Sequence, residues 1–235
     1  MASFLLVHGS CHGAWCWEET VPALAALGHA ARAIDLPGHG ADPTPPEGVT
    51  LDDYARAIVA ALRDGDILVG HSMGGFPITA AAELAPERIA RLVYLCAYVP
   101  SAAGHSLAEM RRLAPRQPLV EAIRRDGPVF TIDPEMAVAK FFHDVEPGRA
   151  ARAVARLGKQ PVAPQEVPVT PDRALGVPRS YIRCTEDGAV PYEFQVTMTG
   201  DWAEGTVFEM QTSHSPFLSD PEGLAALLDR IAEAA

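Results

Sequence analysis

Short apolar runs alternate with helical patterns along this chain, and this alternation constrains the fold more than any other feature. The apolar runs expected to form strands are Ser3–His8, Ala30–Asp35, Asp66–Gly70, Arg91–Ala97, Arg179–Cys184 and Thr206–Met210. The helical patterns are Trp17–Leu27, Leu51–Leu62, Gly74–Leu84, Tyr192–Thr199 and Pro221–Ala234. Strands that alternate with helices are typical of a parallel sheet covered on both faces. The order therefore predicts a six-stranded, mainly parallel α/β sheet.

The alternation stops after the fourth strand. From Ser101 to about Val177 no run has the pattern of a strand, and prolines interrupt the segment repeatedly. A structureless loop of this length is not expected inside a compact domain. We therefore expect residues 101–177 to form a helical lid, and residues 1–100 and 178–235 to form the core. The lid helices would be Leu107–Leu113, Leu119–Arg125, Glu135–Phe142 and Ala150–Leu157.

Composition limits the classes of molecule that the chain is expected to bind. Hydrophobic residues make up 48% of the 235 residues, which supplies a sizeable core, and the net charge of −11 disfavours nucleic acid and anionic membrane surfaces. No apolar stretch is long enough to span a bilayer, and the N-terminus has the pattern of a strand rather than of a signal peptide. The four cysteines, Cys11, Cys16, Cys96 and Cys184, lack disulfide-framework or metal-ligand spacing. We expect a cytoplasmic protein, and the sequence is compatible with a homodimer.

The segment Gly70-His71-Ser72-Met73-Gly74 fits the pattern G-x-S-x-G between a predicted strand and a predicted helix. Such a tight turn exposes its serine at the carboxyl edge of a sheet, near the N-terminus of the following helix. Ser72 is therefore the predicted nucleophile. Because a serine hydroxyl is a weak nucleophile, it needs a base.

Chain order selects the base and the acid. In hydrolases with this turn, the serine comes first, then an acid, then a histidine, and of the eight histidines only His214 follows the last strand. Asp187 directly follows the strand Arg179–Cys184 and is the predicted acid, with its neighbour Glu186 as the alternative. The acid would hold the imidazole in the useful tautomer.

Acyl transfer also needs donors for the oxyanion. One is expected to be the backbone N–H of Met73, and the other the backbone N–H of Ser10, with Gly9 as the alternative. We expect His8 and His12 to order this loop through hydrogen bonds.

With these residues, the chain resembles the hydroxynitrile lyase and plant methylesterase branch of the α/β-hydrolases, which includes methyl salicylate esterases and bacterial relatives. The matching segments are HGSCHGAWCW (8–17), DLPGHG (35–40), GHSMGG (70–75) and CTEDGAVPYEFQ (184–195). The resemblance implies the α/β-hydrolase fold, Asp187 as the triad acid, and Ser10 and Met73 as the oxyanion-hole residues. The chain departs from the lyases at two positions. Gly9 stands where they have a threonine, and Ser215 stands where they have a lysine that stabilises the leaving cyanide.

The expected activity is therefore hydrolysis of a small-molecule carboxylic ester through an acyl-enzyme, without a metal or an organic cofactor. Amide, thioester or C–C bond hydrolysis by the same triad is the main alternative, because one fold hosts many chemistries. A hydroxynitrile lyase and a non-catalytic receptor are further alternatives. The predicted substrate-binding residues are Gly9, His12, Leu107 and Phe141.

Overall fold

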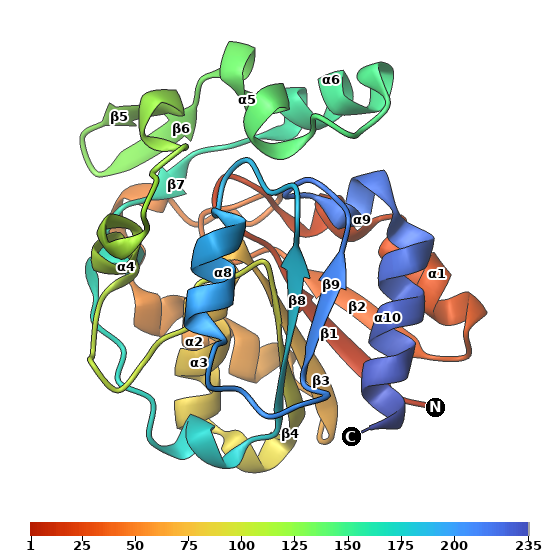
Figure 1. The fold of residues 1–235 in the computed structure, drawn as a ribbon. Helices are drawn as coiled ribbons and strands as arrows, with labels where there is room; N and C mark the ends of the chain where they lie inside the picture. Colours follow the sequence, from red (N-terminus) through yellow and green to blue (C-terminus); the bar gives the residue numbers. More distant parts are fainter. Residues whose placement is uncertain (235) are drawn as a thin grey trace.

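A six-stranded parallel sheet forms the centre of the computed structural model, which describes residues 1–234 (Figure 1). Its strands lie in the order β2-β1-β3-β4-β8-β9, and every neighbouring pair is parallel. They are β1 (Ser3–Val7), β2 (Ala30–Ile34), β3 (Asp66–His71), β4 (Ile89–Leu95), β8 (Arg179–Cys184) and β9 (Val207–Met210). The six predicted strands are confirmed within one or two residues at most ends.

Helices cover both faces of the sheet. They are α1 (Thr20–Ala26), α2 (Leu51–Ala61), α3 (Gly75–Leu84), α8 (Tyr192–Met198), α9 (Pro216–Ser219) and α10 (Pro221–Glu233). Phe4 and Leu6 of β1 face the core that α1 and α10 complete, whereas Leu5 and Val7 face the core of α2, α3 and α8. Successive strand residues point to opposite faces, so a strand buried on both sides is apolar throughout.

The start of α2 shows how the sequence sets a helix end. The Thr50 hydroxyl accepts a hydrogen bond from the Asp53 N–H at 3.2 Å, and the Asp53 carboxylate accepts one from the Thr50 N–H at 2.8 Å. This reciprocal capping box gives acceptors to the backbone N–H groups of Thr50 and Asp53, which have none within the helix. Short 3₁₀ helices lie at Ala14–Trp17, Pro46–Gly48, Ser72–Gly74, Pro86–Arg88, Val120–Ala122 and Arg173–Gly176.

The inserted segment, residues 101–177, contributes no strand to the six-stranded sheet, but it is not wholly helical. Its elements are α4 (Leu107–Leu113), β5 (Ile123–Asp126), β6 (Val129–Ile132), α5 (Pro134–Phe141), α6 (Pro147–Arg156), β7 (Gln160–Pro161) and α7 (Ala163–Glu166). The three strands form an antiparallel sheet in the order β5-β6-β7. The predicted helix Leu119–Arg125 is therefore wrong, since it is one 3₁₀ turn followed by β5.

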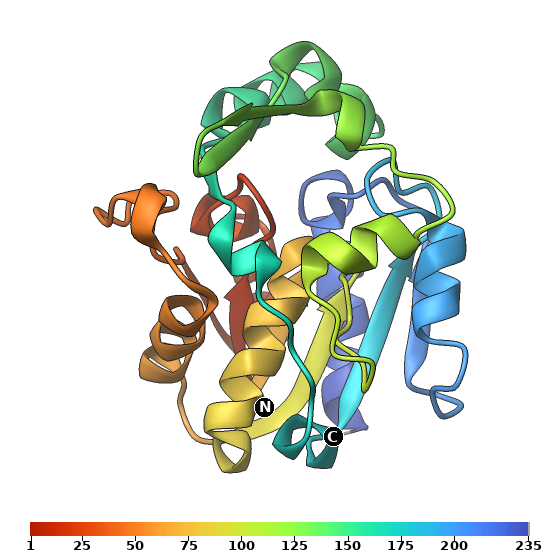
Figure 2. The ribbon, with the colours of Figure 1, turned by 90° about the vertical axis from the view of Figure 1, so that its left-hand side faces the viewer.

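The inserted segment lies over one end of the core. β5, β6, α5 and α6 lie above the end of the sheet to which β8 and β9 point (Figures 1 and 2). After α7, which contacts α2 and α4, the chain returns down the side of the core to α3. There the Glu83 carboxylate accepts hydrogen bonds from the backbone N–H groups of Asp172, Arg173 and Ala174. Among residues 1–234, no helix is both long and apolar enough to traverse a bilayer.

Candidate active site

Ser72 lies in a strained turn between β3 and α3. Its φ of 54° is in the left-handed region, which residues other than glycine seldom adopt. Two glycines make the turn sterically feasible. A Cβ at Gly70 would lie 2.6 Å from the Gly74 carbonyl oxygen, and one at Gly74 would lie 2.9 Å from the His8 carbonyl oxygen. The Tyr98 N–H also donates to the Ser72 carbonyl at 3.1 Å, which ties the turn to the chain after β4.

His214 and Asp187 form a buried hydrogen bond. The distance between His214 Nδ1 and Asp187 Oδ2 is 2.8 Å, and the two side chains are 1% and 0% exposed. The same Oδ2 accepts from Gln195 Nε2 at 3.1 Å, and Oδ1 accepts from the backbone N–H groups of Ala189 and Val190 at 2.7 and 2.8 Å. A carboxylate accepts only, so the proton of this contact lies on Nδ1, and in the neutral ring the lone pair is on Nε2.

The two carboxylates considered for this position lie in different environments. Glu186 is exposed, and its carboxylate accepts from Gln211 Nε2 at 3.1 Å. Only Asp187 contacts the His214 ring. Gln195, to which the sequence analysis gave no role, holds the Asp187 loop as well: its Oε1 accepts from the Cys184 N–H, and its Nε2 donates to the Val190 carbonyl. Gln195 is the last residue of the matching segment CTEDGAVPYEFQ, so this motif could have indicated its role.

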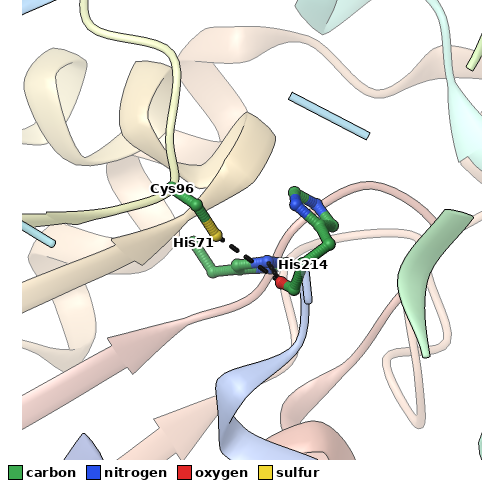
Figure 3. A group of neighbouring side chains, drawn as sticks. All are labelled: His71, Cys96 and His214. Carbon is green, nitrogen blue, oxygen red and sulfur yellow. Dashed lines mark hydrogen bonds between the residues drawn. The ribbon is translucent and has the colours of Figure 1, made fainter. Parts of the chain in front are cut away.

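His71 and Cys96 hold the backbone of His214 (Figure 3). His71 Nε2 lies 2.9 Å from the His214 carbonyl oxygen, and the Cys96 thiol donates to the same oxygen at 3.5 Å. Burial lowers the pKa of His71 and raises the pKa of Cys96 well away from their ordinary values, so both are neutral. Potential ligand atoms of the three residues lie within 4.8 Å of one another. Since a protonated thiol is a poor ligand and both partners contact the carbonyl, the cluster fits a positioning role.

Ser72 and His214 line the same small cavity, of about 20 Å³. It adjoins a larger cleft of about 330 Å³, and five residues line both. The small cavity is lined by Ser10, Ser72, Met73, Tyr98, Leu107, Arg111, Leu119, Ile123, Phe130, Ile132, Phe141 and His214. The structure thus brings the predicted nucleophile, base and oxyanion-hole residues together with Leu107 and Phe141.

The loop after β1 is held by hydrogen bonds from the inserted segment. Gln165 Nε2 donates to the Ser10 hydroxyl at 2.9 Å, and Gln160 Oε1 accepts from the Cys11 N–H at 3.3 Å. His8 orders the loop from the core side, because its Nε2 accepts from the Leu36 N–H at 3.1 Å and its Nδ1 donates to the Gly9 carbonyl at 2.8 Å. Burial lowers the pKa of His8 to about 4, so the ring is neutral at pH 7.

Gly9 and His12 lie outside both cavities among the described residues. Gly9 packs against the serine turn, where a Cβ would lie 2.7 Å from His71 Nδ1 and 2.9 Å from the Ser72 Cβ. His12 Nδ1 donates to the Ser10 carbonyl at 2.8 Å, and its ring stacks on Trp15. Both residues therefore pack the loop beside Ser72, and their assignment as substrate-binding residues stays a prediction.

The sheet topology, the strained serine turn and the buried histidine–aspartate pair are the features of an α/β-hydrolase. The model of the alpha/beta hydrolase family matches residues 4–227, and the chain belongs to this family. This match confirms the fold class that the sequence predicted.

Within the family, the chain is similar to plant esterases. It is 32% identical to "Methylesterase 7" of Arabidopsis thaliana, over 98% of this chain and 96% of that protein. It is also 32% identical to "Esterase PIR7B" of Oryza sativa subsp. japonica, over 97% of this chain and 95% of that one. Among solved structures, polyneuridine aldehyde esterase matches with a TM-score of 0.87 and 27% identity, over 99% of both chains. The resemblance to the methylesterase branch is confirmed.

Proposed function

We propose that this protein is a serine esterase that hydrolyses small carboxylic esters, with Ser72 as nucleophile, His214 as general base and Asp187 as the acid that orients it. The observation that carries the proposal is the buried His214–Asp187 hydrogen bond of 2.8 Å beside the cavity that Ser72 lines. The bond supports this assignment, because a neutral histidine that donates from Nδ1 has its lone pair on Nε2, the atom that a serine hydroxyl requires as its base.

In the proposed reaction, His214 Nε2 takes the proton of the Ser72 hydroxyl while the oxygen attacks the ester carbonyl. The resulting imidazolium is stabilised by Asp187, and it then protonates the leaving alcohol. Water attacks the acyl-enzyme in the same way, which releases the carboxylic acid and regenerates Ser72. The backbone N–H groups of Ser10 and Met73 are the proposed donors to the oxyanion, since both residues line the cavity with Ser72.

Two observations support an ester as the substrate. The curated relatives are named methylesterase or esterase and cover nearly the whole chain. The small cavity at Ser72 also favours a compact reacting group, with the rest of the substrate in the larger cleft. Because the same triad can hydrolyse amides, thioesters and some C–C bonds, the leaving group has to be tested directly.

The test compares matched acetyl substrates: p-nitrophenyl acetate, methyl and thiomethyl esters, and an anilide of the same acid. We expect the purified protein to hydrolyse the esters with the highest kcat/KM. Ser72→Ala should abolish this turnover and leave the Tm within a few degrees, because it removes one atom at a cavity wall. Substantial ester turnover by a folded Ser72→Ala variant would contradict the nucleophile assignment. Faster turnover of the anilide or thioester would move the activity to that class.

A further inference from the structure

Arg111 places a positive charge at the wall of the candidate active site. It lies on α4, in the inserted segment, and it lines both the small cavity at Ser72 and the larger cleft beyond it. The residue is partly buried, and burial lowers the pKa of its guanidinium from the ordinary value. Because a guanidinium in a protein stays charged at neutral pH, this is a cation in a partly desolvated site.

Within the described residues, Arg111 has a neutral partner and no acidic one. Its Nη2 donates to Gln165 Oε1 at 2.9 Å, and no carboxylate lies within 4.0 Å of its guanidinium nitrogens. Ten of the other sixteen arginines have an acidic partner among the described residues, as in the pair Arg116–Glu193 at 2.6 Å. Charges removed from water are normally paired. An arginine without such a pair at a cavity wall is therefore suited to an anionic group of a ligand.

The rest of the cleft fits such a ligand. Arg112, Arg116 and Arg125 line it as well. Arg116 pairs with Glu193, and Arg125 lies 4.0 Å from Glu166, so among the described residues Arg111 and Arg112 are the arginines of the lining without an acidic partner. Tyr98 lines both cavities as well, and burial raises the pKa of its phenol, which therefore stays protonated as a donor. The remaining residues shared by the two cavities, Leu119, Ile123 and Phe130, are apolar.

From this arrangement we propose that the preferred substrate is an ester that carries a second, ionised carboxylate, which binds to Arg111 while the ester carbonyl lies at Ser72. An apolar link between the two groups would contact Leu119, Ile123 and Phe130. The substrate class is thus the half-ester of a dicarboxylic acid. This proposal rests on the proposed esterase function of the same site. A guanidinium suits this task because its planar donors match both carboxylate oxygens.

A purely structural role for Arg111 predicts a different result. Arg111 contacts Gln165, and Gln165 donates to the Ser10 hydroxyl. Arg111 could therefore act only by holding the loop after β1 that carries Ser10. In that case its removal would impair charged and neutral esters equally. A substrate-binding role predicts that the loss is confined to the charged esters. The ratio of kcat/KM between a charged and a neutral ester of the same length therefore separates the two roles.

The experiment uses monomethyl esters of glutaric, adipic and pimelic acid, each beside the neutral ester in which an amide replaces the free carboxylate. For the best chain length, we expect the unmodified protein to hydrolyse the acid about tenfold to hundredfold faster than the amide in kcat/KM, as charge-assisted hydrogen bonds imply. Arg111→Gln should abolish this preference, because it should lower kcat/KM far more for the acid than for the amide. Arg111→Lys should restore part of it.

Arg56→Gln is the matched control, since it removes one positive charge from an exposed position on α2 where Arg56 pairs with Asp52. It should leave the preference unchanged. Hydrolysis of the neutral esters without any preference for the acids would overturn the proposal and leave the esterase function intact. An equal loss on both substrates in Arg111→Gln would overturn it in favour of the structural role. Absence of Ser72-dependent turnover on every ester would instead overturn the proposed function.

Discussion

His214 is held at two points, its ring Nδ1 and its carbonyl oxygen. Its Nδ1 contacts Asp187, and its carbonyl oxygen accepts from His71 and Cys96. The Asp187 carboxylate is itself held by Gln195 and two backbone N–H groups. If His214 is the proposed base, these contacts fix it before proton transfer, which is how preorganised sites lower a barrier.

The first prediction separates Asp187 from its neighbour. Asp187→Asn should lower kcat by about 10⁴-fold, because an amide at this position favours the wrong tautomer of His214. Glu186→Gln is the control, since Glu186 is exposed and contacts Gln211 rather than the histidine. It should stay close to the unmodified protein when both are assayed on p-nitrophenyl acetate. A larger loss from Glu186→Gln than from Asp187→Asn would mean that the acid is misassigned.

The sequence could bring Ser72, Asp187 and His214 to one site because each lies within four residues of the carboxyl end of a parallel strand. It could not predict Arg111 or Gln165. Their roles depend on contacts between distant parts of the chain, such as Gln165 with Ser10, 155 residues away. No local pattern contains that information. Gly9 and His12 were expected to bind substrate, but their contacts with the side chains of His71 and Ser72 and with Trp15 follow only from the three-dimensional structure.

At the scale of elements, the core was predictable and the inserted segment only in part. Buried parallel strands such as β3 have a continuous apolar run, whereas the short strands β5 and β6 do not. A signal for them was nevertheless present. Asp126-Gly127 precedes the β-branched and aromatic run Val129–Ile132, and Gly127 has a φ of 57° in the turn. These residues favour a hairpin over the predicted helix Leu119–Arg125, which rested only on the expectation that so long a segment is not structureless.

This hairpin supplies a prediction about substrate selection. Phe130 and Ile132 project from one face of β6 into the small cavity, and Thr131 between them is exposed. Phe130→Ala should enlarge the cavity and raise the kcat/KM of bulky p-nitrophenyl esters relative to short ones. The difference in activation free energy should be about 1–3 kcal/mol for each methylene-sized contact. Thr131→Ala, on the opposite face of the same strand, should leave the ratio as it is. If Phe130→Ala lowered only the Tm, the hairpin would be a structural cover.

At the scale of the whole molecule, buried neutral histidines couple stability to pH. Burial lowers the pKa of His8 from 6.5 to about 4 and that of His12 from 6.5 to about 3, and it lowers the pKa of His39 and His71 as well. Between these folded-state values and 6.5, the unfolded chain binds protons that the folded chain does not. The free energy of unfolding therefore falls as the pH drops through this window.

This coupling is measurable by urea unfolding between about pH 5 and pH 6, where the carboxylates contribute little. We expect the unfolding free energy to fall steeply over this range in the unmodified protein. His12→Phe, which keeps a ring in the aromatic cluster of Trp15, Phe142 and Phe217, should reduce the slope by about 1 kcal/mol per pH unit. An unchanged slope in this variant would show that His12 is not buried neutral in the folded state.

The central claim, an acyl-enzyme on Ser72, is tested most directly by mass spectrometry of the protein quenched during turnover of p-nitrophenyl acetate. Covalent catalysis of this kind releases a burst of nitrophenol and leaves an acyl group on the nucleophile. The account predicts an acetyl group on the peptide that contains Ser72, stoichiometric with the burst and absent from Ser72→Ala. Turnover with no such adduct, or with the acetyl group on another residue in a kinetically competent amount, would contradict it.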